Sequence, residues 1–271
     1  DVLKNIFCLF FSVFETIGIL LYRYNSLNVK KFSYGFCEIL AIYVCSVGFS
    51  YLVVNFIVNM IYKIQCSSET ASNVTKSKNI PKGLLIWGGI SLCWSVWIYA
   101  FFPGSPFWDL SYQLAQYYGL RELNLHPPFS TMIVGMCMDL GRIIFNSDNV
   151  GLWLYILLQF IMLSYACSKT CLLILRFSNN VKICVATTIF YACFPLFGAT
   201  VQCGMKDTIN YALTLLVMVN IYELYWKIRK EEKISVGNWV EGVIITFLSC
   251  LYRKEMVYVY TMVIFGILLY A

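Results

Sequence analysis

Four charged side chains stand beside the apolar stretches of this chain and not in their middles. Asp109 follows one such stretch, Lys206 and Asp207 precede another, and Arg253 follows a third. Placing a charged side chain at membrane depth costs about 3 kcal/mol on insertion scales, so such a residue usually marks function. A carboxylate beside the membrane suits acid–base catalysis. Asp109, Lys206 and Asp207 are therefore the first candidates for a site.

Each candidate also has a purely structural interpretation. Asp109 suits the start of a short helix, where its carboxylate would accept from free backbone N–H groups. Lys206 and Asp207 suit a local ion pair that starts a helix at Thr208. For these residues the structural and the functional interpretation carry equal weight.

The remaining polar candidates are His126, Arg253 and Glu255. His126, the chain's single histidine, stands before two prolines. A lone histidine there more often makes an interfacial hydrogen bond than catalyses a reaction. Arg253, Lys254 and Glu255 are typical anchors at the end of a span, an interpretation that we favour for Lys254.

The candidates must be positioned by the polar stretch between residues 101 and 130. Pro103-Gly104 ends the helix that enters it, because proline lacks a backbone N–H. Residues 109–116 predict a short helix with three polar side chains near one face: Asp109, Gln113 and Gln116. The aromatic residues around it are typical of a helix at a membrane surface: Trp108, Tyr112, Tyr117 and Tyr118.

Composition indicates an integral membrane protein. The chain is 60% hydrophobic and 13% charged over 271 residues, whereas a soluble domain is about one quarter charged. Apolar runs of about 20 residues predict an all-α, polytopic transmembrane bundle and not a barrel. The net charge of +6 fits basic cytoplasmic loops, and no long basic run suits nucleic acid. Twelve scattered cysteines and one histidine make a zinc site improbable.

About nine apolar segments divide the chain. They are Val2–Tyr22, Tyr34–Tyr62, Gly83–Phe102, Phe129–Phe145, Val150–Leu175, Val181–Thr200, Ile209–Trp226, Val240–Tyr252 and Met256–Ala271. We expect a pair of spans over 1–62, a polar cytoplasmic linker over 63–82 and a main bundle over 83–271. Because the chain starts at Asp1 and ends in an apolar run, we expect it to be part of a longer protein.

Lysine and arginine set the expected orientation. The linker and the segment Lys227–Lys233 are basic, which places both in the cytoplasm. Gly83–Phe102 then runs outward and Phe129–Phe145 returns inward, which leaves Asp109 and His126 outside. If every later segment crosses the membrane fully, the number of crossings is inconsistent with a cytoplasmic Lys227–Lys233. We expect one segment between 129 and 200 to be re-entrant, or the runs around Asn179-Asn180 to form one broken element.

The order of five short motifs resembles a known class. They are FPG, WDLSYQ with Asp109, LNLHPPF with His126, GMKDT with Lys206 and YRKE with Arg253. This order is similar to that of the GT-C class of membrane glycosyltransferases, and most similar to an uncharacterised group from Gram-positive bacteria. Protein mannosyltransferases and lipid A aminoarabinose transferases share the general plan. The resemblance covers Gly83–Ala271.

The resemblance implies a role for each candidate. Asp109 would be the catalytic base, and Lys206 and Arg253 would bind the phosphate of a polyprenyl-phosphate sugar. The residues that would position substrates are Gln113, His126, Asp207 and Glu255. Many relatives have two adjacent acidic residues where Asp109 stands alone, and this departure leaves metal dependence open. A divalent cation (Mg or Mn) is possible, with its ligands unknown.

The hypothesis is transfer of a sugar from a polyprenyl-phosphate carrier to an envelope acceptor at the outer face of the bacterial cytoplasmic membrane. A non-enzymatic transporter or flippase of an anionic lipid-linked substrate is the alternative, and it predicts charges at the bilayer midplane. A structural membrane subunit is the third reading, and it predicts that Asp109, Lys206 and Glu255 do not meet in space.

Overall fold

The computed structural model describes residues 80–120 and 126–270, with scattered positions between 5 and 55. The chain divides into two compact units, Asp1–Val74 and Thr75–Ala271. The two predicted N-terminal spans and the linker lie almost wholly outside the described residues, as do Arg121 and Glu122. In the first unit, the Tyr51 hydroxyl donates to Asn5 Oδ1 at 3.4 Å.

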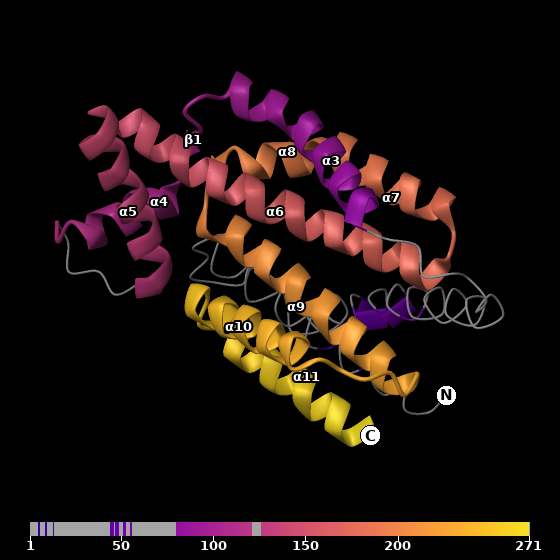
Figure 1. Cartoon of the computed structure of the whole chain (residues 1–271). Coiled ribbons are helices and arrows are strands. Elements are labelled where there is room, and N and C mark those ends of the chain that lie inside the picture. The colour runs from indigo at the N-terminus through magenta and orange to yellow at the C-terminus, as the bar shows by residue number, and fades with distance from the viewer. Residues whose placement is uncertain are drawn as a thin grey trace. The chain divides into compact units, whose positions relative to one another are not determined.

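The second unit is built almost entirely from helices, which confirms the all-α prediction. Its elements, labelled in Figure 1, are α3 (Ile80–Ala100), β1 (Ser105–Pro106), α4 (Trp108–Tyr117), α5 (Pro128–Phe145), α6 (Asp148–Ser178), α7 (Val181–Cys193), α8 (Pro195–Val201), β2 (Cys203–Gly204), α9 (Lys206–Arg229), α10 (Val236–Tyr252) and α11 (Met256–Tyr270).

Three described helices are long and apolar enough to cross a membrane: α3 from Lys82, α5 and α6. A fourth is gained if α7 and α8, which bend by 51° at their junction, form one broken span. The bend falls at Pro195, which has no N–H to continue the ladder of α7. The described part thus supports a membrane protein with three or four candidate spans, and the predicted nine are not confirmed.

α6 is the central helix, and α3, α5, α7 and α9 all pack against it. Near its middle, Gln159 contacts Cys203 in β2. At its last turn, Arg176 contacts Glu223 of α9 and Phe177 stacks edge-on against Trp226. We call the level of β1 and β2 the bridge end of the bundle. The other end, where α6 stops and where residues 227–233 form the last turn of α9 and the loop after it, is the basic end.

α5 does not run back to the basic end, so this part of the predicted topology is wrong. Its first turn lies at the bridge end, where Phe129 packs edge-on against Tyr252. Its last turn packs on the start of α6, where a Cβ on Gly141 would stand 2.2 Å from the Gly151 backbone. Gly151 precedes Gln159 by two turns, so the far end of α5 lies beyond the bridge end. In Figure 1, α5 accordingly crosses the direction of α6, α9 and α10.

Candidate functional site

A short parallel bridge brings two distant loops together. Ser105 pairs with Cys203 and Pro106 with Gly204. The Ser105 N–H also donates to the Gln202 carbonyl at 2.9 Å. The loop that leads into α4 is thereby fixed to the loop that leads into α9. Asp109 and Lys206 stand in the first turns of these helices, so the bridge also fixes where these two residues lie.

Gln159 of α6 holds this bridge from inside the bundle. Its side chain is fully buried, and its amide nitrogen donates to the carbonyls of Val201 at 3.3 Å and Cys203 at 2.8 Å. Its oxygen accepts from the Met205 N–H at 3.2 Å. Buried polar groups need such partners. The sequence analysis missed Gln159, for which the only signal was an amide within an apolar run.

Lys206 joins Asp109 and His126. Its ammonium nitrogen lies 3.0 Å from Asp109 Oδ2 and 2.7 Å from His126 Nδ1. The Lys206 side chain is 13% exposed and that of Asp109 is 39% exposed, so the pair opens to the surface on the carboxylate side. We call Asp109, His126 and Lys206 the lysine cluster. It joins residues up to 97 positions apart in the chain.

The structural interpretations of two candidates are wrong. Phe107 is the N-cap of α4 and no side chain caps it, so Asp109 is not the cap. Helix α9 begins at Lys206 and not at Thr208, and its first two charges pair with other elements. A cation at the N-terminus of a helix opposes the helix dipole, and the Asp109 carboxylate offsets that charge.

His126 is buried, with 8% of its surface exposed. Burial lowers its pKa, and the positive charge of Lys206 lowers it further. The imidazole is therefore neutral at pH 7. Because the Lys206 ammonium can only donate, Nδ1 is the acceptor and Nε2 carries the ring proton.

A second ion pair stands next to the lysine cluster. Arg253, directly after α10, donates to Asp207 Oδ1 at 3.0 Å, and its Nε lies 3.5 Å from Glu255. We call these three residues the arginine cluster. Because Lys206 and Asp207 share a peptide bond, the two clusters are neighbours. Arg253 and Glu255 are thus part of a convergent group, whereas Lys254 is exposed, as an anchor would be.

Two amides of α4 support the turn that carries His126. Gln113 is fully buried and donates to Ser130 Oγ at 3.1 Å, and Ser130 Oγ donates to the Pro127 carbonyl at 3.0 Å. Gln116 donates to the backbone carbonyl of His126 at 3.3 Å. Gln113 therefore contacts the supporting turn and not the lysine cluster. The amide oxygens of Gln113 and Gln116 are buried without a hydrogen-bond partner.

Asp139 of α5 fixes α4 from its other end. The hydroxyls of Tyr117 and Tyr118 donate to its two carboxylate oxygens at 2.7 and 2.8 Å. Of the aromatic residues predicted at a membrane surface, Trp108 is 76% exposed. Tyr117 and Tyr118 instead clamp Asp139, an acid within an apolar segment that the sequence analysis did not single out.

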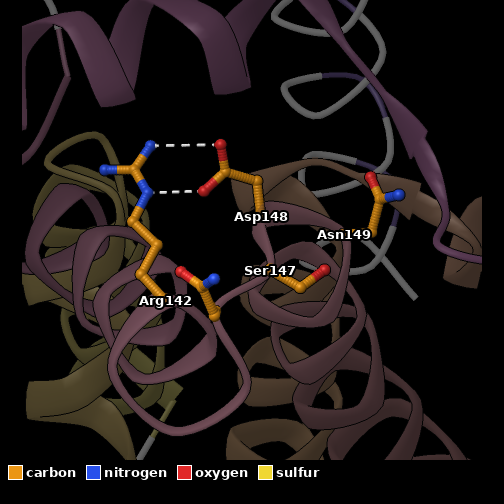
Figure 2. Close-up of a pocket in the computed structure, with 5 residues that line it drawn as sticks. Arg142, Ser147, Asp148 and Asn149 are labelled. Carbon is orange, nitrogen blue, oxygen red and sulfur yellow. Dashed lines mark hydrogen bonds and ion pairs between the residues drawn. The ribbon is translucent and has the colours of Figure 1, made fainter.

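Two cavities lie away from both clusters. A polar hollow of about 550 Å³ lies at the α5–α6 turn, where Arg142 binds Asp148 through two contacts (Figure 2). An apolar groove of about 670 Å³ runs between α3 and α6, with Tyr99, Phe102 and Trp153 in its wall. Within the described residues, no group of three or more His, Cys, Asp or Glu side chains could hold a metal ion. The divalent cation stays a prediction.

A model of one family, described as a family of unknown function (DUF6020), matches residues 123–271. The chain belongs to the DUF6020 family. The matched range includes His126, Lys206, Asp207, Arg253 and Glu255, and begins after Asp109. No curated protein and no solved structure matches the chain.

Proposed function

We propose that this DUF6020 protein transfers a sugar from a polyprenyl-phosphate carrier to a cell-envelope acceptor. The observation that supports this most is the convergence of Asp109, His126 and Lys206 from three segments at the bridge end. A structural subunit gives no reason for these residues to meet. The placement of both clusters at one end of the bundle favours an interfacial enzyme.

The bridge end is the outer face in this proposal. Residues 227–233 hold four basic and two acidic side chains, and basic loops stay in the cytoplasm. α6 and α9 run from the bridge end to that basic end. A lipid-linked phosphate at the outer surface would therefore meet Lys206, Asp207 and Arg253.

The chemistry follows from the residue types. The acceptor hydroxyl attacks the anomeric carbon of the donor sugar while Asp109 takes its proton. The bond between that carbon and the phosphate oxygen breaks, and the electron pair leaves on the phosphate. Lys206 and Arg253 stabilise this charge, and the N-terminus of α9 adds its positive dipole end. His126 and Asp207 hold the two cations in place, Gln113 supports the turn behind His126, and Glu255 shares Arg253.

Asp109 and the donor phosphate compete for Lys206 in this scheme. The ammonium now lies 3.0 Å from the carboxylate, which ties up the base. A phosphate that binds Lys206 draws it from Asp109 and frees the carboxylate for the acceptor proton. His126 still accepts a hydrogen bond from the Lys206 ammonium and holds that group in place.

The test is Asp109→Asn, which keeps the shape of the side chain and removes its basicity. Purified protein in liposomes is given a panel of labelled polyprenyl-phosphate sugars, with bacterial envelope fragments as acceptor. We expect transfer to fall by roughly 10²–10⁴-fold. Glu223→Gln at the basic end is the matched control and should retain activity. Unchanged transfer in Asp109→Asn would overturn the proposal.

One observation favours the flippase alternative. Lys169 lies ten residues beyond Gln159 in α6, about 15 Å towards the basic end at 1.5 Å per residue. It stands over the Tyr165 ring at 5.4 Å, and a charge at this depth is expensive. If the protein moves a lipid, Lys169→Gln should stop transbilayer movement of a fluorescent polyprenyl phosphate. If it is a transferase, the same variant should keep sugar transfer.

A further inference from the structure

We infer that Asp139 is a positioning residue, which holds His126 against Lys206 through the last turn of α4. It acts through the two tyrosine hydroxyls that its carboxylate binds. The placement of His126 does not depend on the proposed reaction, and only the effect on sugar transfer rests on the proposed function.

Asp139 stands on a part of α5 that is fixed to the central helix. Directly before it in the chain, the backbone of Met138 lies so close to α6 that a Cβ on Gly151 would stand 2.7 Å from the Met138 Cα. Two helices in such contact have no free space between them into which either could shift. The carboxylate of Asp139 therefore projects from a firm base.

This carboxylate holds two neighbouring side chains at once. The Tyr117 hydroxyl donates to Asp139 Oδ2 at 2.7 Å, and the Tyr118 hydroxyl donates to Oδ1 at 2.8 Å. Hydrogen bonds to a carboxylate are about twice as strong as those between neutral groups. The two rings meet edge-on with centroids 5.0 Å apart, and a Cβ on Gly135 would overlap the ring of Tyr117. Both the position and the orientation of Tyr117 are therefore set by α5.

The same turn of α4 supports His126. Gln116 precedes Tyr117 in the chain, and its amide nitrogen donates to the His126 carbonyl at 3.3 Å. The imidazole of His126 in turn lies 2.7 Å from the Lys206 ammonium. The backbone hydrogen bonds of a helix make adjacent residues of one turn move together. A displacement of Tyr117 is therefore passed to Gln116 and then to His126.

A purely structural clamp predicts a different result. Its loss would destabilise the fold and would leave the contact between His126 and Lys206 unchanged. The two cases differ at His126, the single histidine of the chain. Burial and the charge of Lys206 lower the pKa of His126, so the titration midpoint of its imidazole reports on both the burial and the contact.

The test removes the clamp in two ways and follows His126 by NMR. Asp139→Leu takes away the acceptor of both hydroxyls and suits an apolar helix, whereas Gly135→Ala leaves every polar group in place and displaces the Tyr117 ring. The whole chain is purified in detergent with a tag that contains no histidine. In both variants we expect the midpoint to rise towards the ordinary 6.5, because the ring loses its burial and its contact with Lys206.

Asp148→Leu is the matched control. It removes another carboxylate, which binds Arg142 of α5, and leaves the clamp intact. The midpoint of His126 should not move in this variant. An unchanged midpoint in both clamp variants, whether or not the unfolding temperature falls, would overturn the inference. A shift of the same size in Asp148→Leu would also overturn it, because the response would not be specific to Asp139.

Sugar transfer by the same variants separates the positioning role from the proposed function. If the parent chain transfers sugar in liposomes, we expect Asp139→Leu to lower the initial rate by roughly 10–10²-fold, with Asp148→Leu unchanged. If the midpoint of His126 rises but the parent chain transfers no sugar from any carrier, the positioning role stands and the proposed function fails. If the parent chain transfers sugar and the midpoint stays, the positioning role alone fails.

Discussion

The two ends of α6 and α9 use ion pairs differently. At the basic end, Arg176 binds Glu223 at 2.9 Å, with 44% and 27% of the two side chains exposed. At the bridge end, Lys206 is only 13% exposed and contacts both Asp109 and His126. Near Lys206, the side-chain amides of Gln159 and Gln116 also donate hydrogen bonds to the backbone carbonyls of the adjoining loops. The comparison separates a partly exposed pair that joins two helices from a largely buried lysine that joins three segments of the chain.

The largest expected difference comes from removing one cation at each end. Lys206→Met takes away the partner of Asp109 and the group proposed to stabilise the leaving phosphate. We expect sugar transfer to fall by roughly 10²–10³-fold, as for loss of a transition-state donor. Arg176→Met should keep transfer within about twofold, because a surface pair is worth little. The measurement is initial transfer rate in liposomes; equal losses in both variants would remove the distinction between the ends.

The next effect concerns the support of the bridge. Gln159→Leu leaves the carbonyls of Val201 and Cys203 and the Met205 N–H buried without this partner. We expect the free energy of unfolding to fall by about 1–3 kcal/mol. Asn220→Leu is the matched change near the basic end, where a single 3.4 Å bond to the Asn238 carbonyl is lost, and it should matter less. Thermal unfolding in detergent measures both, and a larger effect of Asn220→Leu would contradict the comparison.

The third effect is on pH dependence at the bridge end. Burial and Lys206 lower the pKa of His126 from the ordinary 6.5, so the unfolded chain takes up this proton at a higher pH than the folded chain. The contribution of His126 to stability is complete above pH 6.5 and is lost as the pH falls through the folded pKa. Because the chain has one histidine, its imidazole gives one NMR titration. We expect a midpoint below 6.5, and Lys206→Met should raise it.

The smallest effect should follow Glu223→Gln at the basic end. This change removes the charge partner of Arg176 but leaves a side chain of the same shape. Since the pair is partly exposed to solvent, the unfolding free energy should change by less than about 1 kcal/mol. A shift comparable to that of Gln159→Leu, measured by the same thermal unfolding, would mean that the basic end is also an organised site.

Local structure was predictable where turn residues and helical spacing agree. The helix predicted over 109–116 is α4, Trp108–Tyr117. The roles that the motif resemblance implies for Asp109 and Lys206 require the two residues to lie together, and they are in contact. The start of α9 was misplaced by two residues, because Lys206 and Asp207 find partners in distant elements that local pairing rules do not include.

Other features had no local signal. Hydropathy gives the length of α5 but not its packing on α6, which depends on the close approach of Gly141 and Gly151. Gln159 was missed because its partners are backbone groups of a loop more than 40 positions away. Asp139 was missed because an acid within an apolar segment is recognised only once Tyr117 and Tyr118 are seen on it.

The shared peptide bond between Lys206 and Asp207 makes the two clusters a single ionic unit. That unit has three carboxylates, Asp109, Asp207 and Glu255, and two cations, Lys206 and Arg253, while His126 is neutral. Its net charge is therefore −1. An anion that binds Lys206 or Arg253 adds to this negative charge, so it has to compete with the carboxylates that now pair with the two cations. Binding of an anion to this unit should therefore depend on the ionic strength at the membrane surface.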